Sequence, residues 1–486
     1  MDKSVLFSSA SELSHELANH AITATDLANE FYKQIKKHNQ RINAIVIDNK
    51  QEALETARKL DLALKNENFP GKLHGVPVTI KESFNLKGHK TTVNFKMLKD
   101  NIASEDSVIV RRLKEAGAII LGKTNVPTLL ADNQTFGPLY PTAKNPYDTS
   151  RTTGGSTGGG AAAVATGMST FEIGTDIGGS IRNPANFCGL FGLKPTENQY
   201  IQSGHVPPFP NARGGFMAMA SIGPLARSME DIELAWKIIN TPDWKYLSAL
   251  PVISRAEKHE YLRDYKIGWF DQTELVVCSD ATQKVLNGLI EKLTSQGVNI
   301  HKFKIDEQWL QQTFETWSTL FGFITGQNAP WIFRQIMKFK FRQQTKGSSF
   351  NAVKSLSKGL SMDFKVFSDT LRIRQELTAQ LMDWFDDYDF IVCPTSIGPA
   401  FKHNPKQRPI KCEGRKIPYP EYNFPFTLPY NVCGNPSLIV PGGLSDEGLP
   451  IGIQIAGPHH SENELIHFGK LIEGLGFKFQ PPKDYI

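Results

Sequence analysis

From Gly75 to the end of the chain, short apolar runs alternate with longer segments that have the spacing and capping residues of helices. Apolar runs of about 4–8 residues bounded by turn residues are typical of buried strands, and apolar residues three and four apart are typical of helices. Their alternation predicts an α/β fold, a single large domain with a mixed central β-sheet covered by helices on both faces. We expect strands at 76–80, 118–121, 170–173, 266–270, 390–393 and 451–456, and helices at 106–116, 158–166, 228–240, 279–295 and 461–475.

The first 70 residues are mainly helical by the same criteria. Thr25 or Asp26 is placed to cap a helix that runs through Lys37, and Ala and Leu recur at helical spacing over 49–66. Between these helices, residues 42–47 have the apolar, β-branched composition of a short strand. We expect this N-terminal helical segment, 1–70, to pack on the core of the rest of the chain.

The composition is sufficient for a core and excludes several classes of protein. Of the 486 residues, 40% are hydrophobic and 21% charged, which is typical of a globular chain. The net charge of +5 is small for this length, so nucleic acid is not an expected partner. We expect no membrane-spanning helix, because no apolar run reaches the ~18 residues that a span requires. We also expect no signal peptide, because residues 1–21 contain no apolar h-region. The five cysteines are scattered without CxxC spacing, which argues against disulfides or a zinc site and for a cytoplasmic location.

Residues 331–358 differ from the rest of the chain, because they contain seven basic residues and no acidic one. Our first interpretation is a solvated, locally helical insertion. The alternative is a segment that faces a membrane or closes over a site, since aromatic side chains interleaved with bases favour a membrane surface. The bases are Arg334, Lys338, Lys340, Arg342, Lys346, Lys354 and Lys358, and the aromatic residues are Trp331, Phe333, Phe339 and Phe341.

Two short motifs match known patterns but lack the context that those patterns need. Residues 117–124 fit the P-loop of nucleotide-binding proteins, yet a predicted helix precedes them and their variable positions are the apolar residues of a buried strand. Residues 154–158 fit the nucleophile elbow of α/β-hydrolases around Ser156, yet the stretch before them is polar. The partner histidine is missing as well, because the nearest candidates, His459 and His460, have the setting of a surface loop.

Lys81 follows directly on a five-residue apolar run, Val76 to Ile80. A lysine at the end of a buried strand is drawn inward, and burial disfavours the charged ammonium form. The pKa of such a lysine falls, and a neutral amine becomes available as a base. For this residue alone, the alternative is an ordinary lysine that reaches solvent or pairs with a carboxylate.

A first glycine-rich stretch, residues 152–161, contains Ser156 and Thr157 and leads into an Ala-rich helix. Either hydroxyl is placed to cap that helix. The density of glycine exceeds what a cap needs, however. It indicates a close approach of the backbone to a ligand, or an unusual peptide geometry at the serine.

A second glycine-rich stretch, residues 174–182, follows the predicted strand 170–173 and has Ser180 at its end. Successive backbone N–H groups in such a turn can converge on one point as an oxyanion hole, and a serine beside them suits attack on a carbonyl carbon. The alternative is a purely structural glycine turn. The expected donors are the N–H groups of Ile177, Gly178, Gly179 and Ser180.

Together, Lys81 and the two glycine-rich stretches resemble the amidase signature family of serine hydrolases. The spacings agree with that family, with 75 residues from Lys81 to Ser156 and 24 from Ser156 to Ser180. The resemblance extends from about residue 10 to residue 480, and the ordered set is specific where one element would be a coincidence. Further matching segments are 75–81, 121–125, 187–195, 222–228 and 448–454.

The resemblance implies a Ser–Ser–Lys triad that needs no metal or cofactor. Ser180 would be the nucleophile. Ser156, held in a cis peptide in the family, would relay a proton between Ser180 and Lys81. Lys81, neutral at rest, would be the general base.

Supporting roles follow from the same resemblance, with a purely structural role as the alternative for each. Asp176 would brace the oxyanion loop, and Arg182 would hold the Ser180 turn through backbone carbonyls. The chain departs from the family pattern at Glu82, where many members have Asp, and at Thr157, where a second serine is usual. The other supporting residues are Gly155 and Thr157, and the residues expected to line an acyl pocket are Leu130, Phe216 and Met217.

The resemblance also implies how the chain is organised. Residues 71–486 would form an amidase signature catalytic domain, with a signature core of about 75–230 and a variable helical insertion of about 305–388. The expected partner is a small-molecule amide. The sequence leaves the oligomeric state open, with a homodimer as one arrangement.

The predicted function is that of a stand-alone amidase, which hydrolyses the C–N bond of an amide to a carboxylate and ammonia or an amine. One alternative within the family is the glutaminase (A) subunit of a tRNA-dependent amidotransferase. Against that alternative, residues 215–221 are apolar and rich in Met, unlike the corresponding pattern of those glutaminases. The second alternative is a catalytically silent binding protein on the same scaffold.

Overall fold

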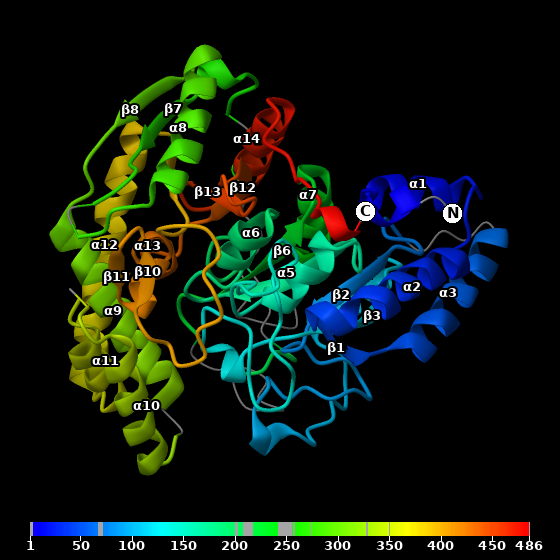
Figure 1. Cartoon of the computed structure of the whole chain (residues 1–486), viewed down its shortest axis with the longest axis horizontal. Coiled ribbons are helices and arrows are strands. Elements are labelled where there is room, and N and C mark those ends of the chain that lie inside the picture. The colour runs from blue at the N-terminus through cyan, green and yellow to red at the C-terminus, as the bar shows by residue number, and fades with distance from the viewer. Residues whose placement is uncertain are drawn as a thin grey trace.

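The core of the protein is one eleven-stranded sheet, in a computed structural model that describes residues 3–66, 71–199, 203–207, 217–241, 255, 258–273, 275–326, 329–348 and 350–485 (Figure 1). Three neighbouring strands near one edge are parallel to one another, as are three at the other edge, and the neighbours between them are antiparallel. In spatial order the strands are β1 (Ile45–Asp48), β3 (Ile119–Thr124), β2 (Pro77–Lys81), β4 (Phe171–Asp176), β6 (Ser221–Ala226), β5 (Phe191–Lys194), β12 (Ser437–Leu444), β13 (Pro450–Ala456), β9 (Phe390–Pro394), β7 (Lys266–Trp269) and β8 (Asn299–Lys302). A separate hairpin consists of β10 (Ile410–Cys412) and β11 (Arg415–Ile417).

Helices cover both faces of this sheet. The side chains of β9 alternate between them: Phe390 and Val392 share a core cluster with the helices on one face, and Ile391 and Cys393 share another with the helices on the opposite face. The prediction of a mixed sheet between two helical layers is therefore confirmed. The helices are α1 (Ala10–Ala18), α2 (Ala24–Ile42), α3 (Lys50–Lys65), α4 (Val108–Glu115), α5 (Gly158–Ala165), α6 (Arg182–Cys188), α7 (Met229–Ile239), α8 (Asp280–Ser295), α9 (Glu307–Gly326), α10 (Trp331–Gln344), α11 (Ala352–Leu360), α12 (Phe364–Asp387), α13 (Phe424–Val432) and α14 (Glu462–Gly474).

Several predicted boundaries were wrong, among them the end of β3, which continues three residues beyond 121 to Thr124. Helix α2 begins at Ala24 and ends at Ile42, and its cap is Thr23, whose hydroxyl accepts the Asp26 N–H at 3.0 Å. The Thr25 hydroxyl is instead engaged by Asp61 of α3, so a neighbouring helix decides where α2 starts. Strand β4 also continues three residues beyond its predicted end at 173, because antiparallel pairing with β6 extends to Asp176.

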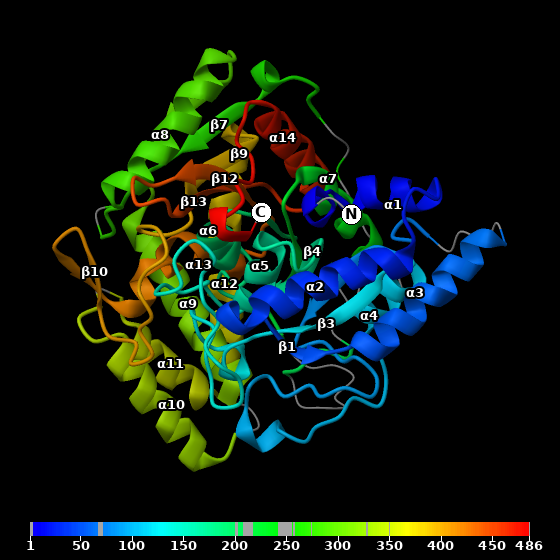
Figure 2. The ribbon, with the colours of Figure 1, turned by 45° about the vertical axis from the view of Figure 1, so that its right-hand side comes forward.

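The N-terminal helices share the main core with the sheet, since Leu13, Leu27 and Phe31 lie in one cluster with Val78 and Ile80. At the other side of the molecule, α9 to α12 form a helical layer with α13 (Figures 1 and 2). The proposed division of the chain at residues 70, 230, 305 and 388 stays a prediction. Among the described helices, none is both long enough and apolar enough to cross a membrane.

Candidate active site

The candidate site lies where three parallel strands end. Lys81 is the last residue of β2, Thr124 the last of β3 and Asp176 the last of β4. Because the strands are parallel neighbours, their carboxyl ends meet at the same edge of the sheet, and Lys81 pairs in register with Thr124. The alternation of strands and helices had predicted β2 and β3, and the tertiary structure places their ends beside β4.

The side chain of Lys81 is fully buried and is surrounded by hydroxyl groups. Its Nζ donates to Ser156 Oγ at 2.7 Å, to Thr175 Oγ1 at 2.8 Å and to Thr157 Oγ1 at 3.0 Å. Burial lowers the pKa of Lys81 to about 7, although the carboxyl groups of Asp176 and Glu172 act in the opposite direction. A large fraction of this amine is therefore neutral near pH 7.

Ser156 lies in a tightly enclosed turn just before α5. The peptide bond between Gly155 and Ser156 is cis. A Cβ atom at position 155 would lie 2.4 Å from the carbonyl oxygen of Asp132, so the turn requires glycine there. Thr135 Oγ1 donates to the carbonyl of Gly154 at 2.9 Å and fixes the approach to the turn.

Ser180 is the third triad candidate, and it lies next to the Ser156 turn. The N–H of Thr157 donates to the carbonyl oxygen of Ser180 at 3.2 Å, which joins the two glycine-rich stretches through their backbones. Ser180 is 8% exposed, whereas Ser156 and Lys81 are almost completely buried. Of the three candidates, Lys81 is therefore the most deeply buried and Ser180 is the most exposed.

The carboxylate of Asp176 organises the turn that carries Ser180. It accepts the N–H of Gly179 at 2.7 Å and that of Ile181 at 3.0 Å, so the chain folds around it. The Gly179 N–H had been expected to face an oxyanion, but it points at Asp176 instead. The candidate oxyanion donors are therefore the N–H groups of Ile177, Gly178 and Ser180.

Two helices from the second half of the chain hold the same turn from outside. The indole Nε1 of Trp317, on α9, donates to the carbonyl of Ile177 at 2.7 Å. Thr427, on α13, donates from Oγ1 to the carbonyl of Gly178 at 3.1 Å. The C=O and N–H groups of a trans peptide unit point in opposite directions. A hydrogen bond to the carbonyl therefore orients the following N–H group towards the opposite side of the turn.

Arg182 acts on this turn through the carboxylate of Asp176, in addition to the hydrogen bond to a backbone carbonyl that had been expected. Its guanidinium forms a fully buried ion pair with Asp176, at 3.0 Å from Nη2 to Oδ1. Although burial raises the pKa of Asp176, the guanidinium of Arg182 holds it well below its usual range. The remaining donor, Nη1, reaches the carbonyl of Thr427 at 2.9 Å and Gln454 Oε1 at 2.8 Å.

Glu172 and Thr175 belong to the site but were missed in the sequence. Glu172 accepts hydrogen bonds from Thr79 Oγ1 at 2.5 Å and from Thr124 Oγ1 at 2.7 Å, and so connects β2, β3 and β4 beneath Lys81. Burial raises the pKa of Glu172 to about 8, against the effect of these hydroxyl groups and of Lys81. An acidic residue inside the apolar strand segment 171–173 was the available signal.

The two departures from the family pattern keep their functional groups. Glu82 accepts the N–H of Thr92 at 2.6 Å and that of Val93 at 2.7 Å, so its longer side chain holds the backbone of a distant loop. The hydroxyl of Thr157 contacts the amine of Lys81. The added methyl group does not displace that hydroxyl from the site.

The predicted acyl pocket remains a prediction. Leu130 is half-buried at the end of a short 3-10 helix, Thr128–Leu130. Met217 is half-buried and packs against the main core cluster. Phe216 lies outside the described residues.

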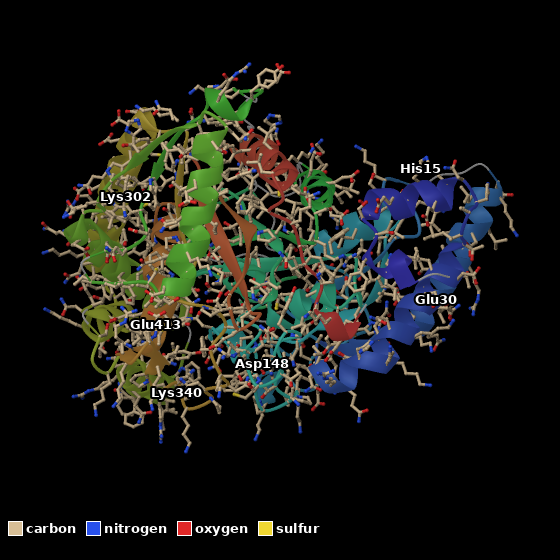
Figure 3. All side chains as sticks on the ribbon, turned by 45° about the horizontal axis from the view of Figure 1, so that its top comes forward. His15, Glu30, Asp148, Lys302, Lys340 and Glu413 are labelled. Carbon is tan, nitrogen blue, oxygen red and sulfur yellow. The ribbon has the colours of Figure 1, made fainter. Side chains whose placement is uncertain are left out.

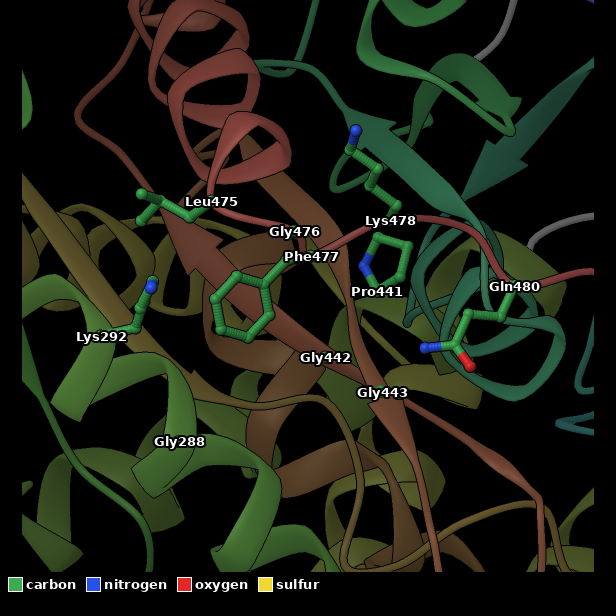
Figure 4. A pocket seen from close by; sticks show the side chains of 10 residues that line it. All are labelled: Gly288, Lys292, Pro441, Gly442, Gly443, Leu475, Gly476, Phe477, Lys478 and Gln480. Carbon is green, nitrogen blue, oxygen red and sulfur yellow. The ribbon is translucent and has the colours of Figure 1, made fainter.

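One pocket of about 320 Å³ lies elsewhere, between α8 and the segment that follows α14 (Figure 4). Its lining includes Lys292, Phe477, Lys478 and the glycines of β12, and no candidate site residue. Within the described part of the chain, no group of three or more His, Cys, Asp or Glu side chains is arranged to hold a metal ion.

Comparison with known proteins identifies the family. Residues 26–466 match the model of the family described as Amidase. The glutamyl-tRNA(Gln) amidotransferase A-subunit of Bdellovibrio bacteriovorus is 31% identical, over 96% of this chain and 97% of its own. Its counterpart of the same name from Koribacter versatilis is 30% identical, over 97% and 99%.

Solved structures share the fold. A bacterial aryl acylamidase of the amidase signature family has a TM-score of 0.80 at 23% identity, over 99% of this chain and 97% of its own. The glutamyl-tRNA(Gln) amidotransferase A-subunit from Thermotoga maritima has a TM-score of 0.73 at 24% identity, over 94% of each chain. Because the family model matches most of the length of this chain, the chain belongs to the amidase signature family.

Proposed function

We propose that this chain hydrolyses a carboxylic amide through an acyl-enzyme on Ser180. The observation that carries the proposal is the buried amine of Lys81, at 2.7 Å from the hydroxyl of Ser156 and surrounded by other hydroxyl groups. Because burial lowers the pKa of Lys81 to about 7, this amine has a lone pair to accept a proton at neutral pH.

In the proposed reaction, Ser180 Oγ attacks the amide carbonyl carbon while its proton passes to Ser156, and the proton of Ser156 passes to Lys81. The carbonyl oxygen becomes an oxyanion, which the N–H groups of the Ser180 turn stabilise. The loss of one such donor typically costs ~10²–10³ in turnover. When the C–N bond breaks, the proton returns from Lys81 through Ser156 to the departing nitrogen, and water then hydrolyses the ester on Ser180.

Glutamine is the first amide to test. The relatives at 28–31% identity are named as the A-subunit of a glutamyl-tRNA(Gln) amidotransferase, which favours the glutaminase alternative over the stand-alone amidase predicted from the sequence. In that role, ammonia released at Ser180 would pass to another protein of the same complex.

A stand-alone amidase with an apolar acyl pocket is the second candidate. It is favoured by the aromatic cluster beside the Ser180 turn. The ring centroid of Trp317 lies 4.6 Å from that of Phe321, with the rings stacked, and 5.1 Å from that of Phe424. Such a cluster suits an aryl or alkyl acyl group better than the polar side chain of glutamine.

The test is ammonia release by the purified chain from glutamine and from a panel of aryl and alkyl amides. We expect Ser180→Ala to lower turnover by about 10⁴-fold or more. Ser461→Ala, which changes another buried serine, should leave turnover unchanged. Turnover of glutamine alone identifies the glutaminase, and turnover of the apolar amides alone identifies the stand-alone amidase.

A fluorophosphonate probe separates an enzyme from a silent binding protein. An activated Ser180 should be labelled in the wild-type chain and not in Ser180→Ala. No labelling, together with no release from any amide, would refute the proposal and favour the silent scaffold.

A further inference from the structure

Helix α10 exposes large apolar side chains to solvent. Trp331 is 72% exposed, Ile332 65%, Ile336 47% and Phe339 63%. Exposed apolar residues occur singly on most protein surfaces, whereas a contiguous group marks a contact site. Four of them within nine residues therefore require an explanation.

Ile332, Ile336 and Phe339 form a stripe on the exposed face of α10, and Trp331 lies to one side of it at the first residue of the helix. At about 100° per residue, Ile332, Ile336 and Phe339 lie within a narrow sector. The opposite face is occupied, since Phe341 is buried and Met337 packs against the cluster that contains α11. The stripe is thus additional to the face that holds the helix on the protein.

Basic residues flank the stripe on both sides. The helical step places Lys340 on one side of it and Lys338 and Arg342 on the other. Residues 331–358 contain no acid, and none of these three bases forms a salt bridge among the residues that the structure describes. Figure 3 labels Lys340 at the lower edge of the molecule, among projecting side chains.

The position of α10 leaves the stripe accessible. The helix lies at the lower edge in two views, and it packs mainly on α11 (Figures 1 and 2). The candidate active site lies at the carboxyl ends of β2 and β4, in another part of the fold. A contact at α10 would therefore leave the catalytic groups in place.

We propose that α10 is an interfacial anchor, which lays its apolar stripe into an anionic lipid surface while its bases contact the headgroups. Apolar residues with Trp at one end and flanking Lys and Arg are the composition of helices that lie in a membrane interface. A protein partner is less well matched, because a standard interface takes about 20–30 residues on each side and the stripe is one face of one helix. This role goes beyond amide hydrolysis and does not depend on it.

The test is co-sedimentation of the full chain with vesicles of phosphatidylcholine alone and of phosphatidylcholine mixed with phosphatidylglycerol. We expect binding to the anionic vesicles that weakens as salt is raised. Phe339→Ser should lower the ratio of bound to free protein about tenfold. Lys338→Gln with Lys340→Gln should lower it roughly thirtyfold, since each lysine near an anionic surface contributes about 1 kcal/mol.

Leu62→Ser is the matched control, because Leu62 is 59% exposed on α3, distant from α10. It should bind like the wild type, and every variant should keep the wild-type activity. Brominated lipid should quench Trp emission in the wild type more than in Trp331→Phe. Equal binding to both vesicle types, unchanged binding of the α10 variants, or binding to RNA or to an acidic protein in place of vesicles would overturn the proposal.

Discussion

Lys81 is an example of a side chain whose chemistry depends on what replaces water around it. Its neighbours within hydrogen-bond distance are the hydroxyl groups of Ser156, Thr157 and Thr175 and, at 3.4 Å, the carbonyl oxygen of Thr175. Hydroxyl groups solvate an amine without adding a negative charge, so burial outweighs the more distant carboxyl groups and the pKa falls to about 7. Ionic neighbours would have kept the ammonium charged.

The pH dependence of activity should report this amine. Because Lys81 acts in its neutral form, we expect kcat/KM to fall about tenfold per pH unit below a midpoint near 7. Lys81→Met should lower turnover by several orders of magnitude and abolish this dependence. A wild-type profile that is flat from pH 5 to 8 would exclude Lys81 as the base.

Glu172→Gln tests the neutral acid beneath Lys81. Burial raises the pKa of Glu172 to about 8, so the folded chain holds a proton that the unfolded chain loses near its usual 4.5. The stability from this group is present below pH 4.5 and is lost as the pH rises towards 8. We expect Glu172→Gln to remove that slope in urea titrations and to leave the midpoint of the kcat/KM profile in place, because Glu172 raises the pKa of Lys81 only in its ionised form. A kinetic midpoint that moves down by one unit would mean that Glu172 is ionised beside Lys81.

At the scale of elements, the Ser180 turn is assembled from three parts of the chain. β4 delivers it, α9 contacts it through Trp317 and α13 contacts it through Thr427. Each helix donates a hydrogen bond to one peptide carbonyl of the turn. The same two peptide units carry the N–H of Gly178, a candidate oxyanion donor, and the N–H of its neighbour Gly179. The predicted helical insertion therefore contributes to the site, although nothing in its sequence pattern indicates this.

Trp317→Phe should lower kcat about tenfold with little change in KM, because the carbonyl of Ile177 loses its donor and the oxyanion groups lose their orientation. Trp309→Phe is the matched control. It lies on the same helix and is equally buried, and its indole donates to the carbonyl of Leu377 at 3.1 Å. Both changes should cost about 1–3 kcal/mol of stability. An equal loss of activity in the two variants would show that α9 acts only through stability.

At the scale of the molecule, Arg182 joins the two halves of the chain. Its guanidinium pairs with Asp176 at the end of β4 and reaches Gln454 in β13, 272 residues further along the sequence. These strands are several positions apart in the sheet, so the side chain bridges them beneath the site. The arrangement of the site and the integrity of the sheet depend on the same group.

Arg182→Met should destabilise the protein by roughly 3–5 kcal/mol, because it leaves the buried Asp176 without its partner. Adding Asp176→Asn should recover part of that loss, which urea unfolding of the two single variants and the double variant can measure. As a control, Lys284→Met removes an exposed ion pair with Asp446 and should leave the urea midpoint of unfolding unchanged. Losses that simply add in the double variant would mean that the pair is not coupled.

Residues that are close in the sequence were sufficient to predict much of this protein. The strands predicted from the apolar runs before Lys81 and within 118–121, and the helix predicted over 228–240, depend on short-range patterning, and the structure confirms that they form. The look-alike P-loop was also dismissed correctly, since residues 119–124 form the buried strand β3. Such features require only the residue's own neighbours, because strand and helix formation follow local apolar spacing and capping.

Contacts between residues far apart in the sequence could not be derived in this way. Thr175 beside Lys81, Trp317 on the Ser180 turn and the Asp176 carboxylate that occupies the Gly179 N–H depend on how strands and helices are placed in space. An N–H group can donate to an acceptor only along its own bond direction. The local sequence does not determine which of several carbonyl or carboxylate oxygens lies in that direction. Packing of the complete sheet and its two helical layers selects among them, which is why the triad candidates were visible in the sequence and the groups that orient them were not.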